Sequence, residues 1–529
     1  RDRLERNQKS GARTWLFRTD TTPRCPVPQF GSEAHRQYTL ICDFSQSSPG
    51  DLVDVLRRQS MRSALIIFYF GRLDAERRRE LAHICRRQRK TLLLVDDILM
   101  VYLATVQGPK LDALFQCALP FTSFMPYSST ASLLPPEVFF GRRREIEALE
   151  STTSNGSCFL YGGRQIGKTV LLKHVQRRVH RPGQGQIAKY IELKVNGIGL
   201  NRSVDDLWEV LYEGLEGDEV PLLTEKRPRR ITAAFFRRRT VEWLTDDPQR
   251  RLLVLLDEAD AFMESDGKGS GADSIPFGVC DQMRGLMVET ELRFKVVLAG
   301  LHNVQRSTRV ANNPLAHFGS PICVGPLLRD GEAREAEALI RHPLSALGIF
   351  FADTSLPIRI LAQTNYYPNL IQIYCQSLLA HITEKQGFQA PDRTPPYVIT
   401  SEDIDDVYER QELRYELREK FRLTLDLDRR FSLIAHLLAL YETEFPDGML
   451  ADDIRRDTLE WWPNGFLSTG DPSRPLPQDA FRDLLDEMVG LGILRRTRDG
   501  TRYGLRSPNV SAMLGTKKQI EGVIEGAVH

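Results

Sequence analysis

The stretch CFLYGGRQIGKTVLLKHV, at residues 158–175, decides the fold. Its centre, Gly162-Gly163-Arg164-Gln165-Ile166-Gly167-Lys168-Thr169, fits the G-x-x-x-x-G-K-[ST] pattern of a phosphate-binding loop. An apolar strand pattern precedes the loop and a helical pattern follows it, so loop amides and a helix N-terminus can surround a phosphate. We expect Lys168 to contact the β- and γ-phosphates of a nucleotide and Thr169 to bind Mg²⁺, with Val170 in the same binding segment.

A second apolar run, LLVLLDE at residues 252–258, ends in two acidic residues. A buried strand of this kind places its acidic end at the carboxyl edge of a parallel sheet, beside the phosphate loop. We therefore expect Asp257 to hold Mg²⁺ through water and Glu258 to be the catalytic residue that polarises the attacking water.

Residues 92–97, LLLVDD, also end in paired acids, but no phosphate loop precedes them in the chain. We interpret Asp96 and Asp97 as a turn at the end of a strand, and a degenerate nucleotide domain is the alternative. Asp257-Glu258-Ala259-Asp260 spells DEAD, the signature of one helicase family. That family needs a serine-alanine-threonine motif after the acidic strand, whereas the next strand here reads VVLAGLHNVQR, so we disfavour a helicase.

The alternation of apolar runs and helical patterns predicts the domain organisation. Near-continuous apolar runs at 158–163, 188–195, 252–258 and 294–300 predict a parallel sheet with helices on both faces. Three helical segments followed by a hairpin around Asp499-Gly500 have the order of a winged helix. The expected parts are a linker or tail at 1–37, a small α/β domain of unknown role at 38–125, a linker at 126–136, a P-loop ATPase core at 137–330, a helical lid at 331–420, a winged-helix domain at 421–514 and a tail at 515–529.

Composition excludes several classes of protein. The 529 residues carry 71 Lys and Arg against 70 Asp and Glu, so the chain is not a polycationic nucleic-acid coat. The longest apolar runs are far shorter than the ~18–20 residues that cross a bilayer, and we expect no membrane association. Eight scattered cysteines without zinc spacing predict buried thiols in a reducing cytoplasm. The sequence opens with Arg1 rather than Met and without a signal-peptide pattern, which we expect of a fragment or trimmed chain.

Phe139-Phe140-Gly141-Arg142, with Glu145 and Leu149, resembles the segment that opens the ATPase core of STAND-type, archaeal AAA-like and origin-recognition ATPases. The order of this segment, the phosphate loop, the acidic strand, a helical lid and a winged helix is also similar, over about residues 137–514. The resemblance implies that Phe140 and Arg142 lie near the adenine.

The resemblance extends to two further regions. STAND proteins have a glycine-x-proline motif that touches the nucleotide, and residues 364–370, TNYYPNL, match it with Pro368 while Tyr366 replaces the glycine. The polar sensor region corresponds to His302 and Asn303, followed by two candidates for a charge-sensing arginine. These candidates are Arg306 and Arg309.

Arginine clusters raise the question of nucleic-acid binding. An insertion at about 197–250 contains KRPRR at 226–230 and RRR at 237–239, which either contact phosphates or form a solvated helix face. Arginines also decorate the expected hairpin, but the expected recognition helix at 478–492 is acidic and would repel DNA. The hairpin arginines are Arg495, Arg496, Arg498 and Arg502, and the helix acids are Asp479, Asp483, Asp486 and Glu487.

The sequence thus predicts an ATP- and Mg²⁺-dependent ATPase that acts as a molecular switch of the STAND or AAA-like class, in a signalling or defence-type regulator. We expect protein partners or self-association on activation. The alternative is a nucleotide-loaded DNA-binding ATPase that resembles origin-recognition ATPases and uses its winged helix. DNA binding is possible in the first case but not favoured.

Overall fold

The structure is a computed structural model. It describes residues 14–20, 37–44, 64–74, 92–107, 139–151, 159–215, 228–269, 276–300, 321–346, 349–386, 397–468 and 473–527, with short pieces at 48, 51, 76–78, 80–81, 126–127 and 319. The chain divides into two compact units. The first unit combines residues 1–141 with 327–417, and the second combines 142–326 with 418–529. No helix of the described ranges has both the length and the apolar character needed to cross a membrane.

The second unit is built around a five-stranded, all-parallel sheet in the order β6-β7-β8-β5-β9. Its strands are β5 (Phe159–Gly162), β6 (Gln186–Glu192), β7 (Arg251–Asp257), β8 (Phe294–Gly300) and β9 (Ile322–Val324). β8 is buried along its whole length, and β7 is buried after its first residue. This agrees with the continuous apolar runs in the sequence, because a strand covered on both faces has no polar side.

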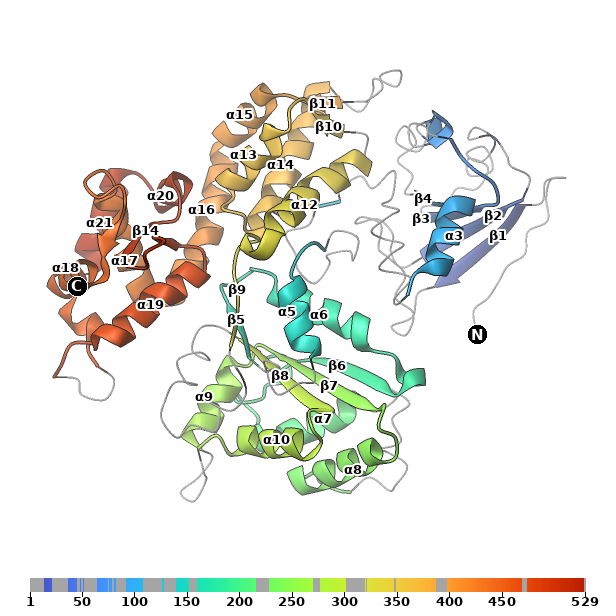
Figure 1. The fold of residues 1–529 in the computed structure, drawn as a ribbon, viewed down its shortest axis with the longest axis horizontal. Helices are drawn as coiled ribbons and strands as arrows, with labels where there is room; N and C mark the ends of the chain where they lie inside the picture. The colour runs from blue at the N-terminus through green and yellow to red at the C-terminus, as the bar shows by residue number, and fades with distance from the viewer. Residues whose placement is uncertain are drawn as a thin grey trace. The chain divides into compact units, whose positions relative to one another are not determined.

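Helices cover both faces of this sheet (Figure 1). One face carries α5 (Arg143–Glu150) and α6 (Lys168–Val179). The other carries α7 (Leu207–Leu215), α8 (Ala233–Thr245) and α10 (Gly278–Glu289), while α9 (Asp260–Lys268) follows β7. Large apolar side chains from α7, α8 and α10 pack on the sheet in one continuous core, including Trp208, Phe236 and Met283. Two 3-10 helices, Pro182–Gln184 and Val204–Asp206, lie in the connections around β6.

The C-terminal part of the second unit is a winged helix. Its three-stranded antiparallel sheet has the order β12-β14-β13. The elements are α17 (Arg429–Leu440), β12 (Met449–Leu450), α18 (Ala451–Trp461), a 3-10 helix (Pro463–Phe466), α19 (Gln478–Gly490), β13 (Leu494–Arg496), β14 (Arg502–Leu505), α20 (Pro508–Leu514) and α21 (Lys517–Ala527). The last helix corrects the expectation of a tail at 515–529. It packs against α17 and buries Ile520 and Ile524, which are spaced one helical turn apart.

The first unit contains a four-stranded sheet in the order β1-β2-β3-β4. Its strands are β1 (Thr14–Asp20), β2 (Gln37–Asp43), β3 (Ala64–Tyr69) and β4 (Leu92–Asp96). The last three are parallel, as predicted, but β1 is antiparallel to β2 and lies in the segment expected to be a linker or tail. Its apolar part, Trp15-Leu16-Phe17, is only three residues long and stands in a polar, proline-containing segment, so the segment as a whole did not predict a strand.

The acidic end of β4 is a helix cap. Asp96 is buried, accepts a hydrogen bond from the Leu99 amide and forms an ion pair with Arg78. Helix α3 (Asp97–Thr105) begins directly after it. A carboxylate that stabilises a helix N-terminus in this way agrees with the interpretation of Asp96 and Asp97 as a strand-end turn.

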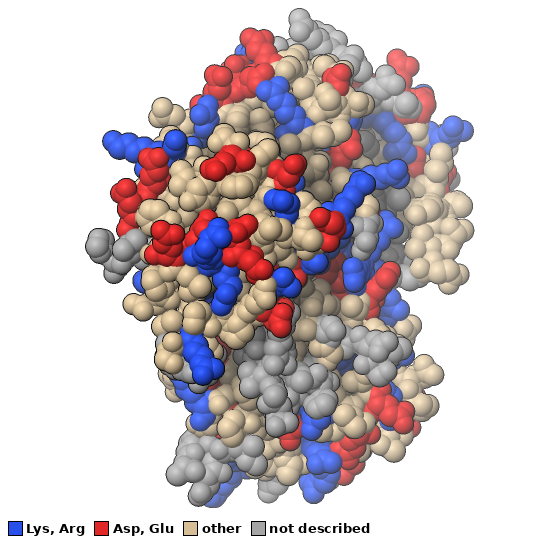
Figure 2. All heavy atoms as spheres, turned by 60° about the vertical axis from the view of Figure 1, so that its left-hand side comes forward, with Lys and Arg blue, Asp and Glu red and all other residues tan. Residues whose placement is uncertain are grey.

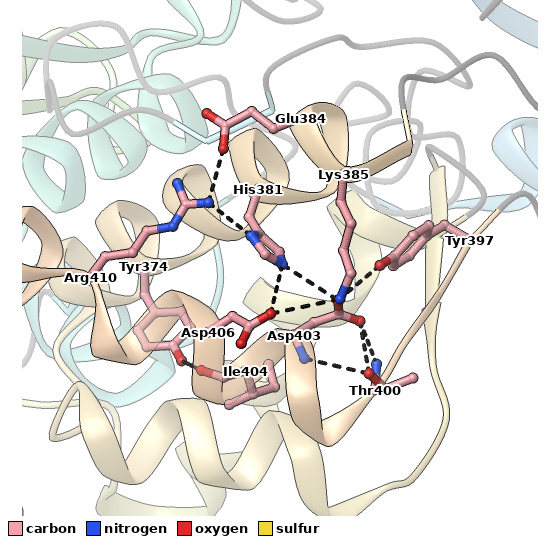
Figure 3. A network of polar contacts seen from close by, with 10 residues as sticks. All are labelled: Tyr374, His381, Glu384, Lys385, Tyr397, Thr400, Asp403, Ile404, Asp406 and Arg410. Carbon is pink, nitrogen blue, oxygen red and sulfur yellow. Dashed lines mark hydrogen bonds and ion pairs between the residues drawn. The ribbon is translucent and has the colours of Figure 1, made fainter.

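The described residues of 327–417 in the first unit are mainly helical, with a small parallel sheet formed by β10 (Ile349–Phe351) and β11 (Tyr397–Ile399). Its helices are α12 (Glu332–Ala346), α13 (Ser355–Gln363), α14 (Pro368–Gln386), α15 (Ser401–Glu409) and the start of α16 (Gln411–Leu425), after a 3-10 helix at Arg329–Gly331. A polar network joins α14 to α15 (Figure 3). At its centre the buried Asp403 carboxylate accepts hydrogen bonds from Lys385, Tyr397 and Thr400.

Candidate nucleotide-binding site

The phosphate loop connects the end of β5 to the start of α6, as the sequence predicts. Two of its glycines are required by the geometry. A Cβ atom at Gly162 would lie 2.5 Å from the carbonyl oxygen of Val324 in the neighbouring strand β9. Gly167 precedes the first residue of α6 with a φ of 102°, in the range that favours glycine. Gln165 also has a positive φ, of 58°, so the loop is tightly wound.

The side chain of Lys168 folds back over the phosphate loop and contacts the first two glycines of that loop. Its Nζ donates to the carbonyl oxygens of Gly162 at 2.9 Å and Gly163 at 2.7 Å. Burial lowers the pKa of Lys168, while the nearby carboxylates of Asp257, Asp260 and Glu258 act in the opposite direction. An ammonium group has three N–H donors, so one is left for a further acceptor after these two bonds.

Asp257 is the hub of the polar contacts at the carboxyl edge of the sheet. It is 2% exposed, and its Oδ2 accepts from the Thr169 hydroxyl at 2.6 Å and from the Tyr190 hydroxyl at 3.0 Å. Thr169 and Asp257 are 88 residues apart in the sequence. The structure therefore brings together the two residues that the sequence predicts as metal ligands.

The sequence predicts that the acidic end of β7 lies beside the phosphate loop, and the contact between Thr169 and Asp257 agrees with this. The strands that carry the two motifs are not neighbours, because β8 lies between β7 and β5. Two strand spacings of ~4.8 Å separate the strands that carry the two motifs. Helix α6 contacts β5, β6 and β7, and in this way its first turn brings Thr169 to Asp257.

Tyr190 was not predicted as a site residue. It lies on β6, and burial, together with the charge of Asp257, raises the pKa of its hydroxyl, so it stays protonated and donates to the carboxylate. In the sequence, the only sign of this role is the hydroxyl that Tyr190 adds to its strand. That hydroxyl does not show that its partner is Asp257.

Glu258 differs from Asp257 in its surroundings. Its side chain is exposed and its φ is 54°, while its amide donates to Asp257 Oδ1 at 3.0 Å. Partial burial and the charge of Asp257 raise the pKa of the Glu258 carboxyl, and Lys168 opposes this shift. An acid that is more basic than usual, next to a buried carboxylate, suits the task of accepting or directing a proton.

The residues of this site fit a phosphate group and a hard cation. Within the described part of the chain, the amides of Gly167, Lys168 and Thr169 have no hydrogen-bond acceptor, as expected for the first turn of a helix. The hydroxyl of Thr169 and the carboxylate of Asp257 are oxygen donors of the kind Mg²⁺ prefers. Among the described residues no group of three or more His, Cys, Asp or Glu is placed to hold a metal by itself.

Thr424, near the end of α16, is a second residue that sequence reasoning missed. It is 1% exposed, and a Cβ atom at Gly163 would lie 3.0 Å from its Oγ1 and 3.2 Å from its Cγ2. The segment that leads into the winged helix therefore touches the phosphate loop within the second unit. Thr424 is far from the motif in sequence and has no local pattern of its own.

The two residues expected near the adenine belong to different units: Arg142 to the second and Phe140 to the first. Arg142 is 4% exposed, and its guanidinium donates to the Gly325 carbonyl oxygen at 2.5 Å and lies 3.4 Å from Glu145. Phe140 belongs to the first unit, where its ring meets the edge of His342 with centroids 5.4 Å apart. These contacts hold both side chains in place without showing a role toward adenine.

The glycine-x-proline match also lies in the first unit. Pro368 is the first residue of α14, and Tyr366 has a φ of 59° with its carbonyl oxygen accepting from Leu327 at 2.9 Å. The tyrosine thus adopts the left-handed conformation that a glycine favours at this point. His302, Asn303, Arg306 and Arg309 lie outside the described residues.

The arginines at 237–239 are paired with acidic side chains, whereas Arg229 and Arg230 of the other cluster are exposed residues. Arg237 pairs with Glu289 at 2.6 Å and Arg239 pairs with Glu242 at 2.8 Å, whereas Lys226 lies outside the described residues. On the face drawn in Figure 2, the coloured basic and acidic side chains are interspersed, without a continuous basic surface.

The winged-helix hairpin shows the same pattern. Arg496 lies 3.3 Å from Asp486 of α19, and Arg495 and Arg502 donate to the carbonyl oxygens of Pro446 at 2.6 Å and Gly448 at 3.1 Å. The pairing of Arg496 with Asp486 lowers the attraction of that arginine for a DNA phosphate, whereas carbonyl contacts leave the charge of Arg495 and Arg502 in place.

The described architecture is a parallel α/β sheet with a phosphate loop, a helical region and a winged helix. No protein-family model matches the sequence, and no curated protein matches it. Three archaeal structures are similar at low identity and low TM-score. They are the Orc2 protein of Aeropyrum pernix in complexes with ADPNP and ADP (15% identity, 73% of this chain and 94% of that chain, TM-score 0.39), Cdc6p of Pyrobaculum aerophilum (13%, 74% and 97%, 0.31) and the Orc1 protein of Aeropyrum pernix in complex with DNA (14%, 73% and 91%, 0.28). Similarities this distant carry no conclusion about the function of this chain.

Proposed function

We propose that this protein binds ATP with Mg²⁺ at the phosphate loop, hydrolyses it slowly or with a partner's help, and acts as a nucleotide-controlled switch. One observation supports this most strongly. The hydroxyl of Thr169 meets the buried carboxylate of Asp257 at 2.6 Å, beside Lys168 and Glu258. The described contacts give no other reason for these four side chains to converge on the N-terminus of one helix.

Each residue has a distinct task in the proposed reaction. Lys168 and the free amides of the first turn of α6 bind the phosphates. Thr169 and Asp257 hold Mg²⁺, which neutralises charge on the phosphate oxygens when it is bound. Glu258 directs the attacking water and takes its proton, which its raised pKa favours.

The contact between Gly163 and Thr424 is the basis of the proposed switch. A phosphate loop that rearranges around a nucleotide changes the space available to Thr424, and with it the position of α16, which enters the winged helix. Loops that order around a γ-phosphate are a common source of such changes. The partners are other proteins or further copies of this chain, in a signalling or defence-type regulator.

The proposal is tested by the dependence of ATP binding on Mg²⁺. Calorimetry should show tighter ATP binding by the full chain with Mg²⁺ than with a chelator. In Asp257→Ala the Mg²⁺-dependent gain should disappear, whereas Asp281→Ala, which removes an exposed acid of α10 paired with Arg284, should retain it. Equal Mg²⁺ dependence in Asp257→Ala and the native chain would contradict the assignment.

A further inference from the structure

A hollow of about 280 Å³ lies at the amino edge of the five-stranded sheet, the edge opposite the phosphate loop. It forms where β6, β7 and β8 begin and where α5 and α6 end. The charged side chains that line it are Glu150, Arg178, Arg181, Arg251, Arg293 and Lys295. Five cations thus surround the hollow with a single acid among them.

One of these cations pairs with the acid of the hollow, and two others donate hydrogen bonds to backbone carbonyl oxygens. Arg178 pairs with Glu150 at 2.7 Å. Lys295 is 2% exposed and donates to the carbonyl oxygens of Ala148, Leu149 and Ser151 at 2.8 to 3.0 Å, while Arg293 donates to that of Leu244. A carbonyl oxygen satisfies a donor but brings no negative charge to cancel that of the ammonium or guanidinium group.

Arg181 and Arg251 stand out within this group. In the part of the chain that the structure describes, neither side chain has a hydrogen bond or an acidic partner within 4.0 Å. Both line the hollow, from the start of the turn before β6 and from the first residue of β7. Like charges gathered in one place repel each other, so an anion that enters the hollow is attracted by the whole group.

The guanidinium groups, the apolar part of the wall and the volume of the hollow indicate which class of anion fits it. Guanidinium groups match the oxygens of a phosphate with two parallel hydrogen bonds. Leu149, Leu252 and Leu253 supply an apolar part of the wall. A volume of about 280 Å³ is at the lower end of the ~300–1,000 Å³ that small-molecule pockets occupy.

From these observations we propose that the hollow binds a small phosphorylated molecule, at a site separate from the phosphate loop. Helix α6 separates the two sites, with Lys168 as its first residue and Arg178 near its end. Twelve residues of helix span ~18 Å, so one small ligand cannot occupy both.

The test uses inorganic pyrophosphate as the probe and the full chain carrying Lys168→Ala, which disables the phosphate loop. Calorimetry at low salt should show one binding site that weakens as sodium chloride is added. Adding Arg181→Ala and Arg251→Ala should weaken binding at least tenfold, and the corresponding lysine changes should restore part of it. The matched control adds Arg237→Ala and Arg238→Ala, which remove two exposed charges of α8 and should leave binding unchanged.

Three results would overturn the proposal. The first is the absence of pyrophosphate binding in the Lys168→Ala chain at low salt. The second is equal affinity with and without Arg181 and Arg251, with circular dichroism showing that both chains are folded. The third is a DNA duplex that binds through these two arginines while pyrophosphate does not. None of these outcomes depends on whether the phosphate loop binds ATP.

Discussion

Replacing Glu258 by Gln separates nucleotide binding from hydrolysis. The change keeps the size of an exposed side chain that follows the buried Asp257, and it removes the negative charge and the basicity. A water-activating base of this kind accelerates a reaction ~10²–10⁴-fold, which corresponds to about 3–5 kcal/mol of transition-state stabilisation. ATP affinity should stay within about threefold of the native value, because Lys168, Thr169 and Asp257 remain in place.

The assay is phosphate release at saturating ATP and Mg²⁺, with ATP affinity measured by calorimetry on the same samples. The native rate should rise with pH through the raised pKa of Glu258, because only the deprotonated carboxylate takes a proton from water. The Glu258→Gln chain should lack this rise. The matched control is Glu264→Gln, which alters an exposed acid of α9 paired with Lys268 and should hydrolyse ATP at the native rate. Equal hydrolysis by the native and Glu258→Gln chains would refute the role of Glu258.

Three further predictions follow from particular contacts. Gly163→Ala places its new Cβ 3.0 Å from Thr424 Oγ1 and should lower the free energy of unfolding, measured with denaturant, by about 1–3 kcal/mol. Adding Thr424→Ala should relieve part of that loss. If the loss is the same with and without Thr424→Ala, the two residues do not touch. Asp403→Asn should destabilise the chain by ~1–3 kcal/mol at neutral pH, because burial of Asp403 is outweighed by hydrogen bonds from Thr400, Lys385 and Tyr397, which lower its pKa (Figure 3). That stability is present above the ordinary aspartate pKa and is lost as the pH falls through the lower pKa of the folded state. Urea unfolding at several pH values should therefore show the free energies of unfolding of the native and Asp403→Asn chains becoming equal in acid. A difference that stays constant with pH would contradict the prediction. A DNA duplex should bind no more tightly to the native chain than to Arg498→Ala, and a clear loss in a salt-dependent shift assay would favour the DNA-binding alternative.

The sequence predicted the elements of the core because their patterns are local. The loop at residues 162–169 carries its own strand, glycines and helix start, and the runs that form β7 and β8 are apolar on both faces. The winged helix was recognisable for the same reason, since each helix has one apolar stripe and the hairpin has Asp499-Gly500 at its turn.

What the sequence could not give depends on contacts between distant segments. The order of the strands places β8 between the two motif strands, and no local pattern specifies that order. Tyr190 and Thr424 enter the site only because β6 and α16 are brought to it by the fold. Strand β1 was missed because its apolar centre, Trp15–Phe17, is short and surrounded by polar residues, and α21 because it was considered without its partner α17.

The central claim, that ATP binds at the phosphate loop, is tested most directly by the affinity of the Lys168→Ala chain for ATP. Lys168 is partly enclosed and donates to two loop carbonyls, so removing its charge from the phosphates should cost ~2–5 kcal/mol and weaken ATP binding at least tenfold. Lys268→Ala, at an exposed pair on α9, should bind ATP with native affinity. Native ATP affinity in a folded Lys168→Ala chain, measured by calorimetry with Mg²⁺, would contradict the account.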